Sequence, residues 1–310
     1  MSIVLYILLS LVTLILFSGL YMFLVACVRG KEPGWLDEDQ IKKTRYGKYY
    51  ENICIGHKFL KEHRAQDVYT ESYDGLKLHA MWVPAENPRG TILFAHGYRS
   101  SKLVDFSLAF NLYYELGMNI LVPDQRAHGE SQGRLITFGV KESRDMQSWI
   151  DYHNEKFGAF PMVLSGLSMG ASTMLYLADK DLPANVRGII ADCGFTSPRE
   201  ILKSVYRNMI HLPAEPTLLA AELFARLFGG FGLSQEDTRK SLKNSKLPVL
   251  MVHGAADDFV PCEMSKQGFE ACTGPKELLL VEGAGHGVSF LADRARYTEM
   301  VNQFLDNNLT

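Results

Sequence analysis

A long apolar segment opens the pattern of hydrophobic positions along the chain. No charged residue occurs from Ile3 to Val28. A helix of this length covers roughly 39 Å, against about 30 Å for the hydrocarbon core of a bilayer. A helix of a soluble domain would carry a polar face, but the few hydroxyl residues of this segment do not form one. We therefore expect residues 3–28 to form a transmembrane helix.

The residues around this helix bear on how it sits in the membrane. A removable secretory signal favours Lys or Arg ahead of the apolar run, and none is present, so we expect a retained single-pass anchor. The alternative is a lipoprotein signal, because Leu24-Val25-Ala26-Cys27 is similar to a bacterial lipoprotein cleavage site. The bases that follow are Arg29, Lys31, Lys42, Lys43, Arg45 and Lys48. Under the positive-inside rule they predict that the rest of the chain is cytoplasmic.

The next part of the chain changes from charged helical patterns to strand patterns. Residues 31–66 are rich in charged and aromatic side chains and are expected to form a helical lead-in. Residues 68–73 and 76–83 then flank Asp74-Gly75, and apolar positions alternate in the second of them. This arrangement predicts a β-hairpin closed by a two-residue turn at the start of a main domain over residues 67–310.

Short apolar runs alternate with helical patterns through the rest of the chain. The predicted strands are 91–95, 119–122, 162–165, 187–191, 248–252 and 277–281, and the clearest helices are 140–156 and 294–309. Strands interleaved with helices predict an α/β fold, with a mostly parallel sheet covered by helices on both faces. In such sheets, functional groups gather at the carboxyl ends of the strands.

One interval is too long to be an ordinary connection between two strands. Roughly fifty residues separate the strand ending near Ala191 from the one beginning at Pro248. Apolar residues recur at helical spacing over residues 219–228, and Gly229-Gly230 ends the run. We expect a helical cap at about 197–246 over the active end of the sheet. Its methionines and aromatics either form a core alone or, in part, line an acyl pocket. The alternative is a surface subdomain away from any site.

Composition and charge exclude several classes of function. Of the 310 residues, 47% are hydrophobic and 22% are charged, and the formal net charge is −3, so a globular domain without a basic surface is expected. Nucleic-acid binding is therefore excluded as a main function. The five cysteines form no Cys-x-x-Cys pair or Cys/His cluster, which gives no reason to expect a disulfide framework, a metal or another cofactor.

A candidate nucleophile occurs in the sequence Gly166-Leu167-Ser168-Met169-Gly170. It follows a predicted strand and precedes a helical stretch. Small residues on both sides of the serine allow a strained strand-to-helix turn that projects the hydroxyl. A serine hydroxyl is a weak nucleophile until a base takes its proton, and that base needs an acid to fix its tautomer.

Two later loops supply such groups, and with them the chain resembles a known family. One predicted strand runs into the sequence His253-Gly-Ala-Ala-Asp-Asp-Phe-Val-Pro261, and the last runs into Gly283-Ala-Gly-His-Gly287. The chain order Ser, Asp, His and the flanking motifs resemble the α/β-hydrolase fold over about residues 68–310.

The resemblance implies roles for individual residues. Ser168 corresponds to the nucleophile, Asp257 to the acid in preference to Asp258, and His286 to the base. The oxyanion would be held by the backbone amides of Met169 and Tyr98. The two remaining histidines at strand ends, His96 and His253, are interpreted as supports for their loops. Asp124-Gln-Arg-Ala-His-Gly-Glu-Ser131 resembles a family segment in which Ala127 replaces a glycine, and it is expected to support the oxyanion loop.

These observations predict a membrane-tethered serine hydrolase that cleaves carboxylic esters with an apolar acyl or alcohol part through an acyl-enzyme. Two alternative enzymes are a serine aminopeptidase-type peptidase acting on short peptides and a thioesterase. The peptidase would need a cap acid for the substrate amine, and the candidates are Glu200, Glu215, Glu222, Glu236 and Asp237. A hypothesis from another class is a non-catalytic interaction module at the membrane. The sequence leaves the oligomeric state open.

Overall fold

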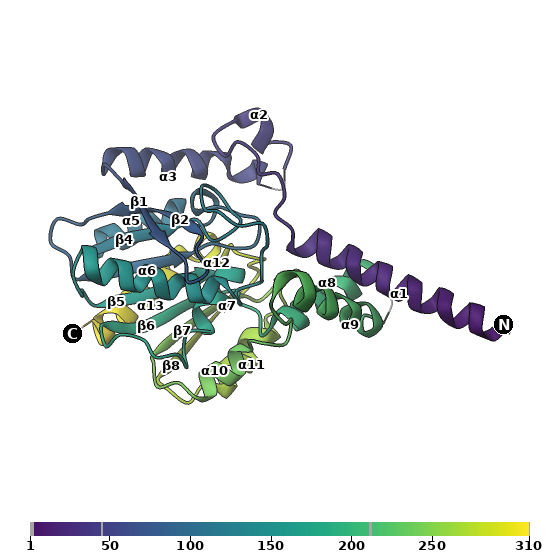
Figure 1. Cartoon of the computed structure of the whole chain (residues 1–310). Coiled ribbons are helices and arrows are strands. Elements are labelled where there is room, and N and C mark those ends of the chain that lie inside the picture. Colours follow the sequence, from purple (N-terminus) through teal and green to yellow (C-terminus); the bar gives the residue numbers. More distant parts are fainter. Residues whose placement is uncertain (1–2, 45, 211–212, 310) are drawn as a thin grey trace.

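The computed structural model describes residues 3–44, 46–210 and 213–309, and its centre is an eight-stranded sheet (Figure 1). The strand order is β1-β2-β4-β3-β5-β6-β7-β8. The strands are β1 (Gln66–Glu71), β2 (Lys77–Val83), β3 (Gly90–Ala95), β4 (Met118–Pro123), β5 (Met162–Leu167), β6 (Val186–Asp192), β7 (Val249–Gly254) and β8 (Lys276–Val281). β2 pairs antiparallel with β1 and β4, and all later pairs are parallel. The prediction of a mostly parallel α/β sheet is confirmed.

Helices cover both faces of this sheet because the central strands are apolar on both sides. Within β3, Ile92 and Phe94 belong to the core beneath one face, and Leu93 and Ala95 belong to the core beneath the other. The first core is closed by α3 (Tyr50–Glu62), α5 (Ser107–Glu115) and α13 (Arg294–Asn308). The second is closed by α6 (Glu142–Lys156), α7 (Met169–Leu175), α10 (Thr238–Lys243) and α11 (Glu263–Ala271). The remaining short helices are α2 (Glu38–Ile41), η1 (Gly47–Tyr49), α4 (Lys102–Asp105) and α12 (Ser289–Ala292).

The hairpin between β1 and β2 differs from the prediction in its turn. The amide of Ser72 donates to the carbonyl of Leu76, so three residues, not two, lie between the last bonded pair. The amide of Gly75 donates back to Ser72, and Gly75 has φ +82°. A turn followed by a left-handed glycine is the usual three-residue hairpin loop. The two-residue turn was therefore wrong, because Asp74-Gly75 forms only its second half.

The N-terminal apolar segment forms α1 (Ile3–Cys27), a helix with mean hydropathy 2.6 that is long enough to cross a membrane. It projects from the body of the protein at the right of Figure 1. Its C-terminal end is fixed to the domain, because Val28 forms a β-bridge with Leu135 and the amide of Ile136 donates to the carbonyl of Cys27.

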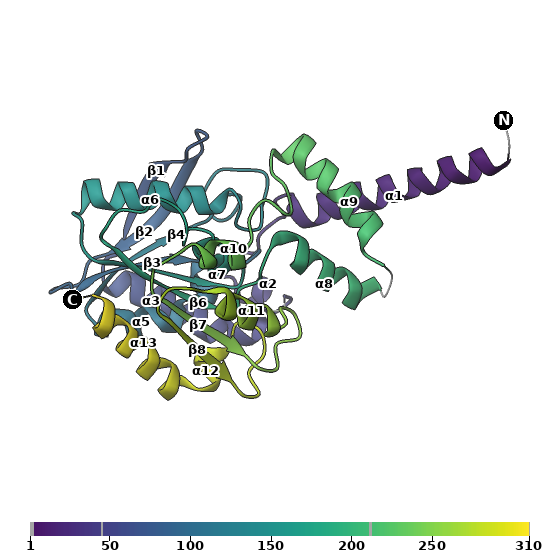
Figure 2. The same cartoon turned by 90° about the horizontal axis from the view of Figure 1, so that it is seen from below.

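The long interval between β6 and β7 is helical in its described residues. It contains α8 (Pro198–Ile210), α9 (Glu215–Phe224), the π-helical turn η2 (Ala225–Gly229) and α10. Figure 2 shows α9 lying across α1. Inward-facing residues of this insertion, among them Ile201, Leu218 and Phe231, share a third apolar core with Phe23 of α1 and with Met169.

Candidate active site

The turn between β5 and α7 holds Ser168 in a strained conformation. Ser168 has φ 55° and ψ −116°, a region that residues with a Cβ rarely occupy. The strain is possible because the flanking glycines let the strand and the helix approach each other. A Cβ on Gly166 would lie 2.3 Å from the backbone of Gly170. The strained turn predicted from the Gly-x-Ser-x-Gly pattern is present.

Gly170 provides a test of this packing. A Cβ at this position would lie 1.8 Å from the carbonyl oxygen of Ala95, a backbone atom at the end of β3. Gly170→Ala is therefore expected to lower the free energy of unfolding by about 3 kcal/mol or more, at the upper end of overpacking effects. Gly285→Ala is the matched control, because a Cβ there meets no atom within 4 Å. Chemical unfolding of both variants in detergent measures the difference, and equal stability would contradict the described packing.

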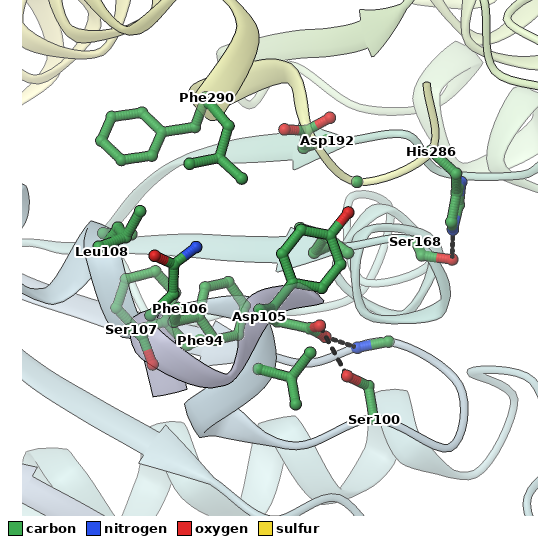
Figure 3. A pocket seen from close by; sticks show the side chains of 18 of the residues that line it. Phe94, Ser100, Asp105, Phe106, Ser107, Leu108, Ser168, Asp192, His286 and Phe290 are labelled. Carbon is green, nitrogen blue, oxygen red and sulfur yellow. Dashed lines mark hydrogen bonds between the residues drawn. The ribbon is translucent and has the colours of Figure 1, made fainter. Parts of the chain in front are cut away.

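Three side chains from separate loops form one hydrogen-bonded chain beside this turn. The hydroxyl of Ser168 lies 2.9 Å from Nε2 of His286, and Nδ1 of His286 lies 2.7 Å from Oδ2 of Asp257. Figure 3 shows the contact between Ser168 and His286 at the edge of the cavity. In the tautomer with a proton on Nδ1, His286 donates to the carboxylate and accepts from the hydroxyl. The structure thus brings the three predicted residues together.

The environment of Asp257 keeps this carboxyl ionised. Burial opposes its ionisation, but hydrogen bonds from His253 and His286 outweigh burial and hold the pKa of Asp257 well below its usual range. Its second oxygen accepts the amides of Phe259 and Val260, both at 2.9 Å. The neighbouring Asp258 is exposed to solvent. Asp257 is therefore the member of the pair that is placed to orient His286 and to stabilise its protonated form.

The loop after β3 runs directly alongside Ser168. A Cβ on Gly97 would lie 3.4 Å from the Cβ of Ser168. The amide of Gly97 itself donates to Asp105 (2.6 Å), while the amide of Arg99 donates to His128 (3.1 Å). The loop is thus fixed on both sides of Tyr98, next to the first turn of α7.

His96 and the segment after β4 contact this loop. His96 accepts from the amide of Gln125 (3.0 Å) and bonds to its own loop at the carbonyl of Gly97 (2.9 Å). Burial, reinforced by the nearby His128, lowers the pKa of His96 to about 3, so it stays neutral. Ala127 has φ 60°, so an alanine occupies the left-handed conformation that a glycine adopts without strain.

The end of α1 is bound to the same loop, which the sequence analysis did not anticipate. The hydroxyl of Tyr98 donates to the carbonyl of Ala26 (2.8 Å). The guanidinium of Arg99 donates to the carbonyls of Val25 and Val28, both at 2.8 Å. Carbonyls in the last turn of a helix lack partners within the helix, and these side chains satisfy them. No local pattern could reveal this contact, because it joins residues about seventy positions apart.

A cavity of about 320 Å³ opens beside Ser168 and His286 (Figure 3). Its walls are largely aromatic and aliphatic, and include Phe94, Phe106, Leu108, Tyr113, Phe290 and Tyr297. The lead-in contributes Tyr46, Lys48, Tyr49 and Asn52. None of the described residues of the insertion at 197–246 lines it. Of the two roles open to the insertion, its described residues take that of core and not that of pocket lining: they pack beside Met169, while the cavity lies under the lead-in.

Asp192 is a buried acid of this cavity that the sequence analysis did not assign. It ends β6 and accepts a hydrogen bond from the hydroxyl of Ser289 (3.0 Å). Burial raises its pKa to about 6. The neighbouring Cys193 is fully buried, and burial raises the pKa of its thiol well above the usual value, as expected for an unreactive cysteine.

One group of side chains in the described part of the chain has the spacing of a metal site. Cys193, Asp257 and His286 each offer a ligand atom, and these atoms lie within 4.8 Å of one another. Asp257 and His286 are hydrogen-bonded to each other, and the thiol of Cys193 is kept protonated by burial. A metal ion would have to break that bond and ionise a buried thiol, so the donor set fits a proton relay better than a metal.

Comparisons with known proteins show the family to which the chain is related. The profile described as alpha/beta hydrolase fold matches residues 90–231, and one described as TAP-like protein matches residues 233–309. The uncharacterized protein YqkD of Bacillus subtilis is 30% identical over 226 residues, which cover 73% of each chain. The uncharacterized membrane protein YNL320W of Saccharomyces cerevisiae is 25% identical over 240 residues, 75% of this chain and 76% of that one.

The fold is also similar to that of a solved esterase. The esterase Pf2001 of Pyrococcus furiosus superposes with a TM-score of 0.66 and covers 81% of this chain and 96% of its own. Its sequence is 21% identical, so the similarity concerns the fold alone.

Proposed function

Because the chain belongs to the α/β-hydrolase fold family, we propose that it is a membrane-anchored serine hydrolase that cleaves carboxylic esters with an apolar part. The observation that carries this proposal is the hydrogen-bonded chain from Ser168 through His286 to Asp257 at the carboxyl edge of the sheet. A hydroxyl, an imidazole and an ionised carboxylate in this order are the parts that an acyl-enzyme reaction requires.

In the proposed reaction, Oγ of Ser168 attacks the ester carbonyl while Nε2 of His286 takes the hydroxyl proton. Asp257 stabilises the resulting imidazolium. The tetrahedral intermediate collapses, and the alcohol leaves with the proton from His286. Water then attacks the acyl group on Ser168 and gives its proton to His286. The acid departs as the serine recovers its proton.

The amides of Met169 and Tyr98 are the proposed donors to the oxyanion. Met169 begins α7, and the first amides of a helix have no partner within it. Tyr98 lies in the loop that passes Ser168, and its hydroxyl and the Arg99 side chain hold that loop against α1. Two amides converging from α7 and this loop would stabilise negative charge on the carbonyl oxygen.

The walls of the cavity favour an ester over a peptide substrate. A largely apolar cavity gains from excluding water around an apolar acyl or alcohol group. The five acids that a peptidase could have used in the insertion do not line the cavity. Glu215 is paired with Arg199 and Lys203, and Glu222 is paired with Arg226. The insertion therefore offers the cavity no carboxylate for a substrate amine, which favours the ester over the aminopeptidase hypothesis.

We assign residues 3–28 to a membrane anchor, 31–66 to the lead-in and 67–310 to the hydrolase domain, with the insertion at about 197–246. A lipoprotein signal fits less well, because Cys27 is buried and its carbonyl accepts the amide of Ile136. The bases after α1 favour a cytoplasmic domain.

Labelling and a substrate panel test the proposal on the full chain in detergent. A fluorophosphonate probe is expected to modify Ser168, and p-nitrophenyl acyl esters are expected to be hydrolysed faster than aminoacyl p-nitroanilides. Absence of labelling in folded protein would favour the non-catalytic module, and faster anilide cleavage would favour a peptidase. The full chain is needed because deleting residues 1–30 would remove the carbonyls that Tyr98 and Arg99 bind.

A further inference from the structure

The anchor helix and the insertion pack closely enough to be one unit. The hydroxyls of Ser18 and Thr217 lie 3.1 Å apart. A Cβ on Gly19 would lie 2.3 Å from the Cβ of Ala220. The two backbones thus approach at a pair of small residues, the packing that brings helices together within membranes. Figures 1 and 2 both show α9 beside the C-terminal half of α1.

The length of α1 places this contact within the membrane. Residues 3–14 are exposed, and close contact with α9 is established at Ser18. The part of α1 before Ser18 is about 22 Å long at roughly 1.5 Å per residue, whereas the hydrocarbon core is about 30 Å thick. A helix that spans the core must therefore include several residues that α9 covers. Consequently α9 extends into the hydrocarbon from the side of the catalytic domain.

The outer surface of α9 and η2 has the composition that such a position requires. Leu219, Leu223 and Leu227 recur every four residues and are 63%, 44% and 65% exposed, and Phe228 beside them is 65% exposed. We call these four residues the apolar face. Exposed clusters of large apolar side chains are uncommon on soluble monomers and mark contact surfaces.

The charged groups of this segment are compatible with a membrane boundary. Oε1 of Glu222 accepts from Nε of Arg226 (2.6 Å), and its other oxygen accepts the amide of Leu233 (2.6 Å). The guanidinium of Arg226 is therefore paired with Glu222 through Nε, and its terminal nitrogens can face lipid headgroups. Glu215, at the start of α9, is paired with Arg199 and Lys203, so no charged side chain of α9 has to be buried alone in hydrocarbon.

We propose that the apolar face is immersed in the bilayer beside α1, so that the insertion is a second membrane-binding element. This proposal rests on α1 spanning the membrane, as in the proposed function, but not on the chemistry of Ser168. The contacts of Tyr98 and Arg99 with the end of α1 then place the carboxyl edge of the sheet at the membrane surface. A substrate dissolved in the bilayer would be released close to the cavity.

Site-specific fluorescence in vesicles tests the immersion. In the full chain, with the accessible Cys54 and Cys262 changed to serine, the polarity probe NBD is attached to Leu223→Cys in phosphatidylcholine–phosphatidylglycerol vesicles. Val12→Cys in α1 is the control inside the membrane. Glu155→Cys, near the end of α6 where the chain enters β5, is the control in water. We expect blue-shifted emission and strong quenching by doxyl-labelled lipids at residues 12 and 223, and neither at residue 155.

Three other results of this experiment would contradict the immersion of the apolar face. Water-like emission at residue 223 with quenching at residue 12 would overturn the immersion of the apolar face. Blue-shifted emission at residue 223 without doxyl quenching would also overturn it, and would indicate that a second copy of the chain covers the face. Absence of quenching at residue 12 would contradict both the membrane-spanning position of α1 and the immersion of the apolar face. Ester hydrolysis measured on the same samples tells these failures apart from a failure of the proposed chemistry.

Discussion

Ser168→Ala is expected to abolish ester hydrolysis while the protein stays folded. The hydroxyl is the atom that forms the acyl-enzyme, and no other described group occupies its place beside His286. Removal of a serine nucleophile lowers kcat by roughly 10⁶-fold in a well-studied protease. We expect a loss on that order, limited by the detection of turnover. The measurement is the hydrolysis rate of a p-nitrophenyl acyl ester together with loss of fluorophosphonate labelling.

The fold should tolerate this change, which makes the result interpretable. The hydroxyl of Ser168 bonds to His286 at the edge of the cavity, and alanine meets the same strain at φ 55° as serine does. Thermal unfolding should therefore be close to that of the unmodified protein. Ser148→Ala, on the half-buried side of α6, is the control that should keep full activity. Turnover retained in pure Ser168→Ala protein would exclude the assigned nucleophile.

Asp257→Asn is expected to lower kcat by about 10⁴-fold, as the loss of the triad carboxylate does in a serine protease. An amide in place of Oδ2 would present a donor to Nδ1 of His286. The imidazole would then carry its proton on Nε2 and could no longer accept one from Ser168. The amides of Phe259 and Val260 keep their acceptor, so the loop should remain in place.

Asp258→Asn is the matched control for this variant. The two aspartates are adjacent, but Asp258 is exposed and Asp257 is bonded to His286. Asp258→Asn should retain near-normal kcat, measured with the same ester and at the same pH. If Asp258→Asn lost activity and Asp257→Asn did not, the assignment of the acid would move to the neighbouring residue.

The insertion shows what a local sequence pattern predicts and what it does not. Its helical character followed from apolar residues recurring at helical spacing, and α9 and η2 occupy that stretch. The position of the insertion relative to the cavity could not be predicted from this spacing. The same leucines fit a pocket lining or a face turned outward, and the choice between these depends on α1, about two hundred residues earlier in the chain.

The sequence by itself determined the α/β class, the eight strands to within a few residues and the strained turn at Ser168, because these depend on neighbours in the chain. Continuous apolar runs make buried strands, and flanking glycines permit the turn. Only the tertiary structure decided that the lead-in borders the cavity, that Asp192 belongs to it and that Tyr98 and Arg99 hold the end of α1. These contacts join distant segments, and their energies depend on shape and burial that no single segment encodes.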